Sequence, residues 1–230
     1  MNLIVLKFGG TSVADINKIK NVANIVQKEL KKYKLIVVLS AMAGVTNQMQ
    51  KHIDNIESEE SLENDLILTA GENVTIGILS AILKKRNIRS IPLLGWQLPI
   101  ITDDNHQKAK ILNIDKKRVM KFFKNNDVIV LAGFQGISIT GKITSLGRGG
   151  SDTTAVAIAA AVDADRCDIY TDVEGVYTTD PNIVFKAKKI SKLAFEEMLE
   201  MSSAGAKVLH TRSVELAMKN NLVMQVLSSL

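Results

Sequence analysis

Hydrophobic residues recur along the chain in two alternating patterns. Short apolar runs have the length of buried strands, and the longer stretches between them repeat apolar residues every three or four positions, as one face of a helix does. The runs typical of strands lie at 3–6, 35–39, 90–94, 127–133, 168–171 and 222–226. The helical patterns lie at 15–32, 46–56, 66–83, 114–124, 152–162, 191–201 and 204–219. This alternation predicts an α/β fold, a three-layer sandwich whose central sheet is mainly parallel and covered on both faces.

Proline and glycine refine this picture at three places. Pro92 in the run 90–94 predicts an edge strand, because proline cannot donate to a sheet ladder. Gly71 lies inside a helical pattern, where it costs about 1 kcal/mol relative to alanine. We therefore expect a close backbone approach at Gly71, beside Glu72. The glycine-rich stretch 141–150 predicts a division of one domain, 1–230, into two lobes, at about 1–140 and about 141–230.

The composition excludes several classes of protein. The 230 residues are 46% hydrophobic and 23% charged, which is typical of globular proteins and excludes disordered, collagen-like and disulfide-rich chains. No run of 18 apolar residues occurs, so we expect no contact with a membrane, and the first residues suit a strand better than a signal peptide. The single cysteine, Cys167, cannot form an internal disulfide, and we expect it to be buried packing in a cytoplasmic protein.

The net charge of +5 raises the question of a nucleic-acid partner. The bases are mostly lysines scattered among acids, and aromatic residues make up only 4% of the chain. A nucleic-acid binder more often carries a basic face or stacking aromatics, so we expect no such partner. A basic pocket for a small anion explains the charge equally well. The three histidines show no metal-ligand spacing, so we expect no metal site built from protein side chains.

The first candidate site is the string Lys7-Phe8-Gly9-Gly10-Thr11-Ser12 at the end of the first predicted strand. Ligands bind at the carboxyl ends of parallel strands, and paired glycines let backbone N–H groups approach a ligand. With the lysine charge, the string is suited to cradle a phosphate, although it lacks the Walker pattern. A glycine turn with a solvated lysine fits the spacing equally well.

The second candidate is the stretch 147–154, in which glycines lead into a predicted helix. Free N–H groups and the helix dipole favour an anion there, and Arg148 can bind a carboxylate through two hydrogen bonds. Ser151 or Asp152 could instead cap the helix. Capping does not explain an arginine between glycines, so we favour a functional site.

Two further stretches carry weaker signals. The loop 170–181 follows a predicted strand and is rich in hydroxyls and turn formers. It suits a ribose or an adenine edge, and its composition fits a surface turn equally well. Lys207, near a predicted helix start, could reach a phosphate, although most lysines are solvated.

Taken together, these segments resemble the aspartate kinases of the amino-acid kinase family. Segments matching the family's order and approximate spacing cover almost the whole chain: 7–12, 40–46, 71–72, 95–97, 133–136, 148–152, 171–181 and 205–210. Each is weak alone, but the ordered set is highly specific. The resemblance implies the amino-acid kinase fold and, with ATP and Mg²⁺, phosphorylation of the L-aspartate side chain to 4-phospho-L-aspartate. That reaction begins the synthesis of lysine, threonine, methionine and diaminopimelate.

The resemblance also implies roles for individual residues. Lys7 contacts the transferring phosphoryl group, Gly9 and Gly10 donate backbone N–H groups to it, and Asp152 orients Lys7. Arg148 binds a substrate carboxylate and Glu72 binds the α-ammonium group. The implied substrate-binding residues are Thr46, Glu72, Phe134, Arg148, Gly149, Gly150 and Ser151. The implied nucleotide-binding residues are Lys7, Phe8, Gly9, Gly10, Ser40, Thr171, Asp172, Tyr177, Thr178, Thr179, Asp180, Pro181, Asn182, Lys207 and Val208. Mg²⁺ would lie mostly among phosphates and waters, and the family implies a homodimer.

Some positions depart from the family pattern. Asn182 stands where an arginine is common, and the loss of a phosphate contact there should weaken ATP binding by about 1–3 kcal/mol. Thr211 replaces a proline and Leu227 an arginine. Aspartate kinases usually continue into C-terminal ACT domains, whereas this chain stops at Leu230, so we expect no inhibition by lysine or threonine through such domains. Two alternatives stay open: a related kinase with another acceptor, and an inactive nucleotide-binding or partner subunit.

Overall fold

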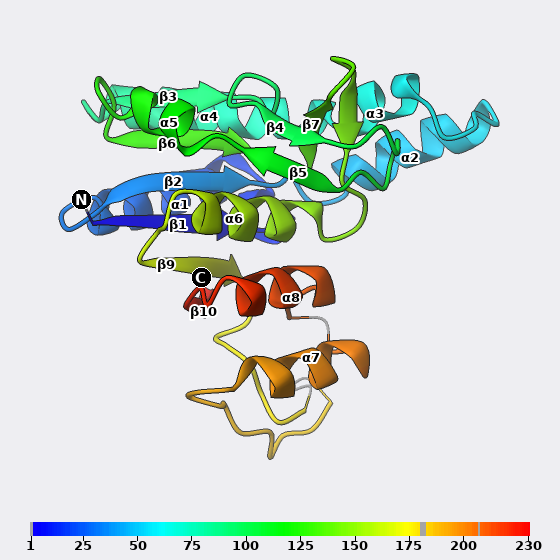
Figure 1. Ribbon diagram of the computed structural model, residues 1–230. Coiled ribbons are helices and arrows are strands. Elements are labelled where there is room, and N and C mark those ends of the chain that lie inside the picture. The colour runs from blue at the N-terminus through cyan, green and yellow to red at the C-terminus, as the bar shows by residue number, and fades with distance from the viewer. Residues whose placement is uncertain (1, 180–182, 207) are drawn as a thin grey trace.

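A six-stranded, fully parallel sheet forms the centre of the molecule (Figure 1). The computed structural model describes residues 2–179, 183–206 and 208–230. The strand order is β10-β9-β1-β2-β6-β3, with β3 at one edge as Pro92 predicts. The strands are β1 (Leu3–Phe8), β2 (Lys34–Leu39), β3 (Ser90–Leu93), β6 (Val128–Ala132), β9 (Arg166–Thr171) and β10 (Met224–Ser228).

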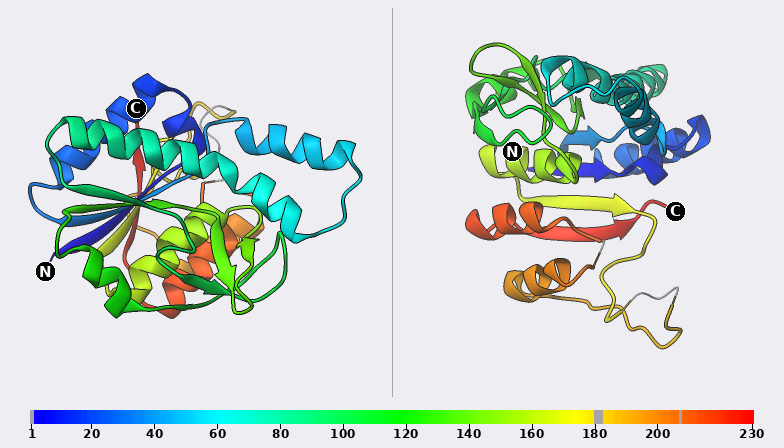
Figure 2. Two further views of the ribbon diagram at one scale, coloured as in Figure 1. Left: turned by 90° about the horizontal axis from the view of Figure 1, so that it is seen from above. Right: turned by 90° about the vertical axis from the view of Figure 1, so that its right-hand side faces the viewer.

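The apolar runs form this sheet because both of its faces are covered. Alternate residues of β1 enter two separate cores: Leu3 and Val5 face one core, and Ile4, Leu6 and Phe8 the other. Helices α1 and α4 cover one face, while α5, α6 and α8 cover the other, with α7 packed outside α8 (Figure 2). The predicted three-layer α/β architecture is therefore confirmed.

The helices begin either at a residue whose side chain caps the first turn or at a residue where the backbone changes direction. Asp15 accepts a hydrogen bond from the Lys18 amide and starts α1, and Ser61 accepts one from the Asn64 amide and starts α3. The helices are η1 (Gly10–Val13), α1 (Ile16–Glu29), α2 (Val45–Asn55), α3 (Leu62–Leu68), α4 (Ala70–Lys85), α5 (Lys116–Phe122), α6 (Gly150–Ala161), α7 (Phe195–Ser203) and α8 (Thr211–Lys219).

Two helical predictions need correction. The pattern 66–83 is divided between α3 and α4, because the chain bends at Thr69, whose hydroxyl donates to the Asp65 carbonyl at 2.7 Å. The pattern 204–219 becomes helical only at Thr211, because Gly205 adopts a left-handed φ of +106° that ends the preceding turn. The close approach expected at Gly71 is confirmed, since a Cβ there would lie 2.6 Å from the Ala41 Cβ.

A second sheet, of four short strands, was not predicted. Its order is β5-β4-β7-β8, with one parallel and two antiparallel pairings. The strands are β4 (Ile100–Thr102), β5 (Ile111–Ile114), β7 (Gln135–Ser138) and β8 (Ile143–Ser145). Strands of three or four residues are too short to show an apolar period, and part of the stretch 141–150 belongs to this sheet instead of being a plain connection.

The stretch Leu62–Lys85, which contains α3 and α4, is long and apolar enough to cross a membrane by length and composition alone. Half of its most apolar part is buried inside the domain, where α4 packs on α1 and on the central sheet. The same packing is found in core helices of globular proteins. Cys167 lies fully buried in β9, as expected of a packing residue.

Candidate active site

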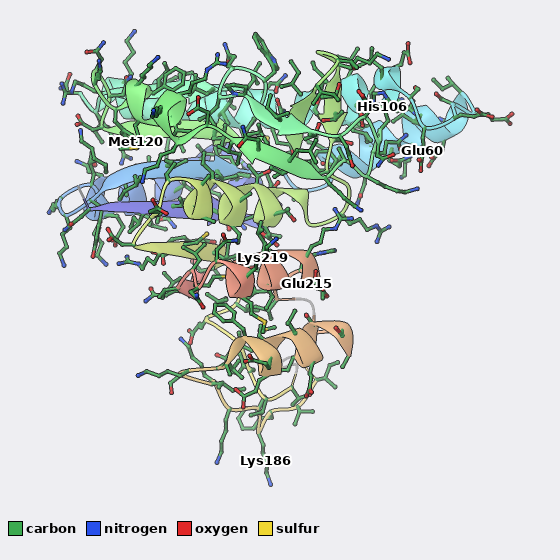
Figure 3. All side chains as sticks on the ribbon, in the orientation of Figure 1. Glu60, His106, Met120, Lys186, Glu215 and Lys219 are labelled. Atoms are coloured by element: carbon green, nitrogen blue, oxygen red, sulfur yellow. The ribbon has the colours of Figure 1, made fainter. Side chains whose placement is uncertain are left out.

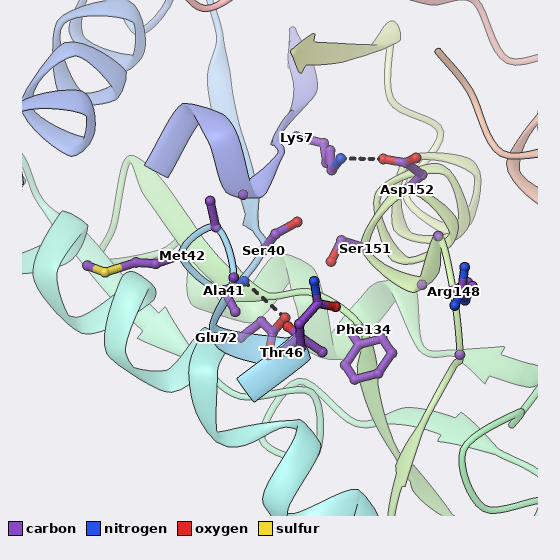
Figure 4. A pocket seen from close by; sticks show the side chains of 17 residues that line it. Lys7, Ser40, Ala41, Met42, Thr46, Glu72, Phe134, Arg148, Ser151 and Asp152 are labelled. Carbon is purple, nitrogen blue, oxygen red and sulfur yellow. Dashed lines mark hydrogen bonds and ion pairs between the residues drawn. The ribbon is translucent and has the colours of Figure 1, made fainter. Parts of the chain in front are cut away.

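Loops at the carboxyl ends of β1, β2 and β6 meet the start of α6 around a cavity of about 310 Å³ (Figure 4). In a parallel sheet these strand ends share one edge, which is where ligands bind. Three stretches that are far apart in the sequence, near Lys7, near Ser40 and near Arg148, therefore line one space. The lining residues are Lys7, Gly10, Ser40, Ala41, Met42, Ala43, Gly44, Thr46, Asn47, Glu72, Phe134, Gly147, Arg148, Gly149, Gly150, Ser151 and Asp152.

An ion pair between Lys7 and Asp152 lies on one side of this cavity. The Lys7 Nζ is 2.6 Å from the Asp152 Oδ1, and the two side chains are only 12% and 13% exposed. Lys7 comes from β1 and Asp152 from the first turn of α6, where the helix dipole favours an acid. An ammonium group has three donors, so Lys7 can hold Asp152 and still donate to a ligand.

The glycines beside Lys7 leave the backbone open to a ligand. A Cβ on Gly9 would lie 3.5 Å from the Lys7 Nζ, and one on Gly10 would lie 3.0 Å from the Ala41 carbonyl oxygen. A Cβ at Gly10 would be tight against the neighbouring loop, whereas one at Gly9 would make an ordinary contact with the lysine. The absence of side chains thus keeps the cationic group and backbone amides close together, which suits a phosphate.

The segment 147–150, called here the Arg148 loop, needs its glycines. Gly147 and Gly149 have left-handed φ values of +74° and +69°. A Cβ on Gly149 would lie 2.4 Å from the His210 ring, and one on Gly150 would lie 2.7 Å from the Phe134 ring. These contacts fix the path of the loop.

Arg148 itself is exposed at the cavity, and among the described residues its guanidinium has no ion pair or side-chain hydrogen bond. The helix that follows, α6, has no side-chain cap, so Ser151 and Asp152 do not serve as its N-cap. The positive end of the helix dipole is thus free beside an unpaired arginine, and the pair favours a carboxylate or phosphate.

Glu72, in the first turn of α4, supplies a negative group to the same cavity. Its side chain is buried, and its Oε1 accepts a hydrogen bond from the Ala41 amide at 3.0 Å. Its Oε2 is buried and has no partner among the described residues. Burial raises the pKa of Glu72 to about 7, against the lowering effect of the Ala41 hydrogen bond. A buried oxygen without a donor indicates that a ligand supplies one.

The predicted nucleotide loop begins at Thr171, the last residue of β9, while Lys7, Gly10 and Ser40 of the predicted nucleotide site line the cavity itself. Strand β9 pairs with β1, and the Gly9 amide donates to the Tyr170 carbonyl at 3.3 Å. Phe8 is fully buried and stacks on Tyr170 with ring centroids 4.6 Å apart, so only its backbone is available to a ligand. Val208 also turns toward the core, where it packs against buried residues.

The loop after β9 is held by its own hydrogen bonds. The Thr171 hydroxyl donates to Asp172 at 3.1 Å, and Thr178 exchanges hydrogen bonds with the Lys188 backbone. Tyr177 forms an isolated bridge with Lys189. Thr179 is exposed. Asp180, Pro181, Asn182 and Lys207 lie outside the described residues.

Most lining residues lie in the predicted stretches: Met42 belongs to the segment 40–46 and Gly147 to the candidate stretch 147–154, although neither was assigned a role of its own. Asn47 lay outside every predicted stretch. Asn47 carries no signal of its own, because its place is set by where α2 begins. Within the described residues, no three histidine, cysteine or acidic side chains gather into a group that could hold a metal ion.

Comparisons with known proteins agree with this geometry. The aspartokinase of Rickettsia felis is 50% identical over all of this chain, which spans 58% of that protein. The aspartate kinase structure from Synechocystis matches 99% of the chain with a TM-score of 0.88 and 40% identity, over 38% of its own length. Aspartokinase III of E. coli, in complex with aspartate and ADP, matches 99% of the chain with a TM-score of 0.86 and 29% identity, over 62% of its length.

The chain thus spans less than two thirds of the length of each of these three aspartokinases. The model of the amino acid kinase family matches residues 2–228, which include β1, the Arg148 loop and the closing strand β10. With its parallel sheet, its lysine at the end of β1 and its glycine loop before α6, the chain belongs to the amino acid kinase family.

Proposed function

We propose that this domain is the catalytic part of an aspartate kinase, which transfers the γ-phosphoryl group of ATP to the side-chain carboxylate of L-aspartate. The observation that carries the proposal is the set of groups around one cavity. Within the described part of the chain, the Arg148 guanidinium has no ion pair and suits the α-carboxylate, and the Glu72 Oε2 has no donor and suits the α-ammonium group. Lys7, held by Asp152, suits the phosphoryl group. The E. coli relative crystallised with aspartate and ADP supports the same pairing of ligands.

The proposed chemistry needs no general base. The attacking side-chain carboxylate of aspartate is already ionised at pH 7. Its oxygen forms a bond to the γ-phosphorus while the bond from that phosphorus to the leaving oxygen of ADP breaks. Catalysis then consists of holding two anions in line and stabilising the charge that moves between them. In this proposal the Lys7 ammonium and the Gly10 amide do this, and the Gly9 amide contributes by exchanging its 3.3 Å hydrogen bond to the Tyr170 carbonyl for one to the phosphoryl group.

Asp152 keeps the Lys7 ammonium in place during the transfer. The 2.6 Å ion pair is largely shielded from water, so it restrains the lysine more strongly than a surface pair would. Thr46 and Ser151 line the same cavity and offer hydroxyls to the substrate, while Gly149 and Gly150 set the path of the loop beneath it. Phe134 packs under Gly150 and closes that side of the cavity.

The nucleotide is proposed to lie over the carboxyl ends of β1 and β9. Ser40 and the stretch 171–179 border that region, and the family resemblance adds Asp180, Pro181, Asn182, Lys207 and Val208. Mg²⁺ fits a site made mostly of phosphate and water oxygens, since the described residues offer no cluster of acidic ligands. When bound, Mg²⁺ would neutralise charge on the phosphates.

Several wider features are part of the same proposal. Acyl phosphate formation on aspartate would begin the synthesis of lysine, threonine, methionine and diaminopimelate, in the cytoplasm. The division into a substrate lobe and a nucleotide lobe near 141–150 stays part of the proposal, although Lys7 and Ser40 from the first stretch and Arg148 from the second line the same cavity. A homodimer is proposed from the family, and a solution mass equal to that of one chain would contradict it.

An acceptor screen tests the proposed function. The protein is incubated with ATP, Mg²⁺ and L-aspartate, L-glutamate, N-acetylglutamate or UMP, and ADP release is coupled to hydroxylamine trapping of any acyl phosphate. We expect transfer to L-aspartate far above N-acetylglutamate and UMP, because Glu72 and Arg148 select a free α-amino acid. We expect less transfer to L-glutamate, because its extra methylene displaces the attacking carboxylate when the α-groups are bound. A preference for another acceptor, or nucleotide binding without transfer to any of them, would refute the proposal.

A further inference from the structure

A buried carboxylate outside the cavity connects the parts that hold the Arg148 loop. Asp65, in α3, is fully buried. Its Oδ1 accepts hydrogen bonds from the Ser145 hydroxyl at 2.5 Å and from the Gln107 amide at 3.0 Å. Its Oδ2 lies 2.6 Å from the His106 Nδ1. Three donors from two other segments thus meet on one carboxylate, which satisfies it despite its burial.

Both of these segments reach the Arg148 loop directly. Ser145 ends β8, two residues before Gly147. Gln107 lies on the loop after β4, at the end of the molecule where α2 and α3 lie (Figure 3 labels its neighbour His106). A Cβ on Gly147 would lie 2.8 Å from the Gln107 carbonyl oxygen, so the two backbones are in close contact. The Ala109 amide also donates to the Ser145 carbonyl at 3.0 Å, which joins the two segments to each other.

The contact between Gln107 and Gly147 requires an unfavourable backbone conformation at Gln107. Gln107 has a φ of +62°, in the left-handed region that is unfavourable for a residue other than glycine. The hydrogen bond from its amide to Asp65 offsets this strain. The carboxylate therefore holds Gln107 in the shape that packs against Gly147.

Asp65 also lies close in the chain to the second substrate-binding group. The Thr69 amide and hydroxyl both donate to the Asp65 carbonyl oxygen, at 3.0 and 2.7 Å. Thr69 is the bend between α3 and α4, and Glu72 follows it by three residues. The backbone of Asp65 thus supports the helix that presents Glu72, while its side chain supports the loop that presents Arg148.

We propose that Asp65 is a positioning residue for substrate binding, acting through Ser145, His106 and Gln107 to hold the Arg148 loop. It touches no ligand in this scheme. The kinetic test of this inference rests on the proposed function. The structural test measures how often the Arg148 loop opens, and it requires no enzymatic activity.

The first experiment compares Asp65→Asn with Asp168→Asn. Asp168 is a matched control, because it is also fully buried and accepts hydrogen bonds from Arg166. It lies in the first half of β9, away from the carboxyl end of that strand. We expect Asp65→Asn to raise the KM for L-aspartate about tenfold and to leave the KM for ATP within about twofold, since small misplacements of a binding group cost this much. Asp168→Asn should change neither. An unchanged KM for L-aspartate in Asp65→Asn would overturn the proposal.

A double-mutant cycle separates positioning from general destabilisation. If Asp65 acts through Arg148, Asp65→Asn should change the KM for L-aspartate less than about twofold in an Arg148→Ala background, because the group being positioned is gone. The same rise in both backgrounds would contradict the proposal. Should Asp65→Asn fail to fold, Ser145→Ala removes one of the three donors and should produce a smaller rise of the same kind.

Trypsin provides the readout that does not depend on activity. Cleavage after Arg148, followed by the masses of the two fragments, reports how often the Arg148 loop opens. We expect faster cleavage in Asp65→Asn than in Asp168→Asn at equal fractions of unfolded protein. Equal rates would refute the positioning role. If wild-type protein shows no transfer to L-aspartate, the proposed function fails while this measurement still decides the role of Asp65.

Discussion

The substitution Glu72→Gln tests the central feature of the cavity, which is a buried carboxylate proposed to bind the α-ammonium group of the substrate. The amide has the same shape as the carboxyl group and can still accept the hydrogen bond from the Ala41 amide. It cannot carry the negative charge. The variant therefore removes only the negative charge. We expect it to increase the stability of the folded protein and to weaken the binding of substrate.

The stability effect follows from the pKa. The pKa of Glu72 is raised by burial from its ordinary 4.5 to about 7 in the folded protein without ligand. The folded state then binds a proton more tightly than the unfolded state, so this group's contribution is fully present below pH 4.5 and is lost as pH rises toward 7. The ionised side chain costs up to about 3 kcal/mol at pH 8. Denaturant unfolding of the variant should show a gain in stability at pH 8 that largely disappears at pH 5.

The kinetic effect runs the other way. A hydrogen bond to a charged group contributes about 1.5–3 kcal/mol, so loss of the pairing with the α-ammonium should raise the KM for L-aspartate about 10- to 150-fold. In the wild type this KM should also rise as pH falls below 7, since only ionised Glu72 pairs with the ammonium group, and in the variant it should be flat. Glu63→Gln, on the exposed side of α3, is the control. Hydrogen bonds at the helix start lower the pKa of Glu63, so this variant should show no gain in stability at pH 8 and no change in the KM for L-aspartate.

Two results would refute this reasoning. One is a KM for L-aspartate in Glu72→Gln within about threefold of the wild type, which would mean that the carboxylate does not bind the amine. The other is a stability difference between the two proteins that does not change between pH 5 and pH 8. The latter would mean that Glu72 is not held in a raised-pKa environment.

Three further substitutions address the rest of the cavity. Lys7→Met should lower kcat about 10²- to 10³-fold with a much smaller change in the KM for ATP, because the charge acts where negative charge moves; equal losses in binding and turnover would contradict that role. Arg148→Lys should raise the KM for L-aspartate about tenfold, since an ammonium group cannot make the two parallel hydrogen bonds of a guanidinium, and an unchanged value in steady-state assays would argue against carboxylate binding. Gly149→Ala should raise that KM and lower stability by more than Gly141→Ala, because both residues have a positive φ but only Gly149 has a neighbour, His210, within 4 Å. Equal effects of the two substitutions in unfolding and kinetic measurements would exclude the contact with His210.

Much of the fold was predictable because buried segments show a recognisable spacing of apolar residues in the sequence. The run Leu35–Leu39 is apolar throughout because β2 lies inside a sheet covered on both faces, and that pattern predicts a parallel sheet. Pro92 placed β3 at an edge, and Gly71 indicated a close approach that the Ala41 contact confirms. The strands of the small sheet were missed, since three residues such as Ile143–Ser145 hold no measurable period.

The residues of the cavity were likewise only partly predictable. The strings around Lys7 and Arg148 were candidates because glycines beside a cation can hold an anion, although for Lys7 a plain glycine turn fitted the spacing equally well. Their meeting follows from the topology of a parallel sheet. Local sequence patterns do not contain the environment that tertiary contacts create around each side chain. The raised pKa of Glu72 depends on how deeply α4 packs, and the hydrogen bonds of Asp65 depend on two segments more than 40 residues away.

The sequence by itself therefore determined the strands of the central sheet, most of the helices and the short strings that can hold an anion, because apolar spacing and glycine conformation are local properties. Only the tertiary structure decided which of those groups share a cavity, which carboxylate is left without a donor, and which one supports the Arg148 loop. Electrostatic and hydrogen-bond energies depend on distance and burial in space, and the chain sets both only after it has folded.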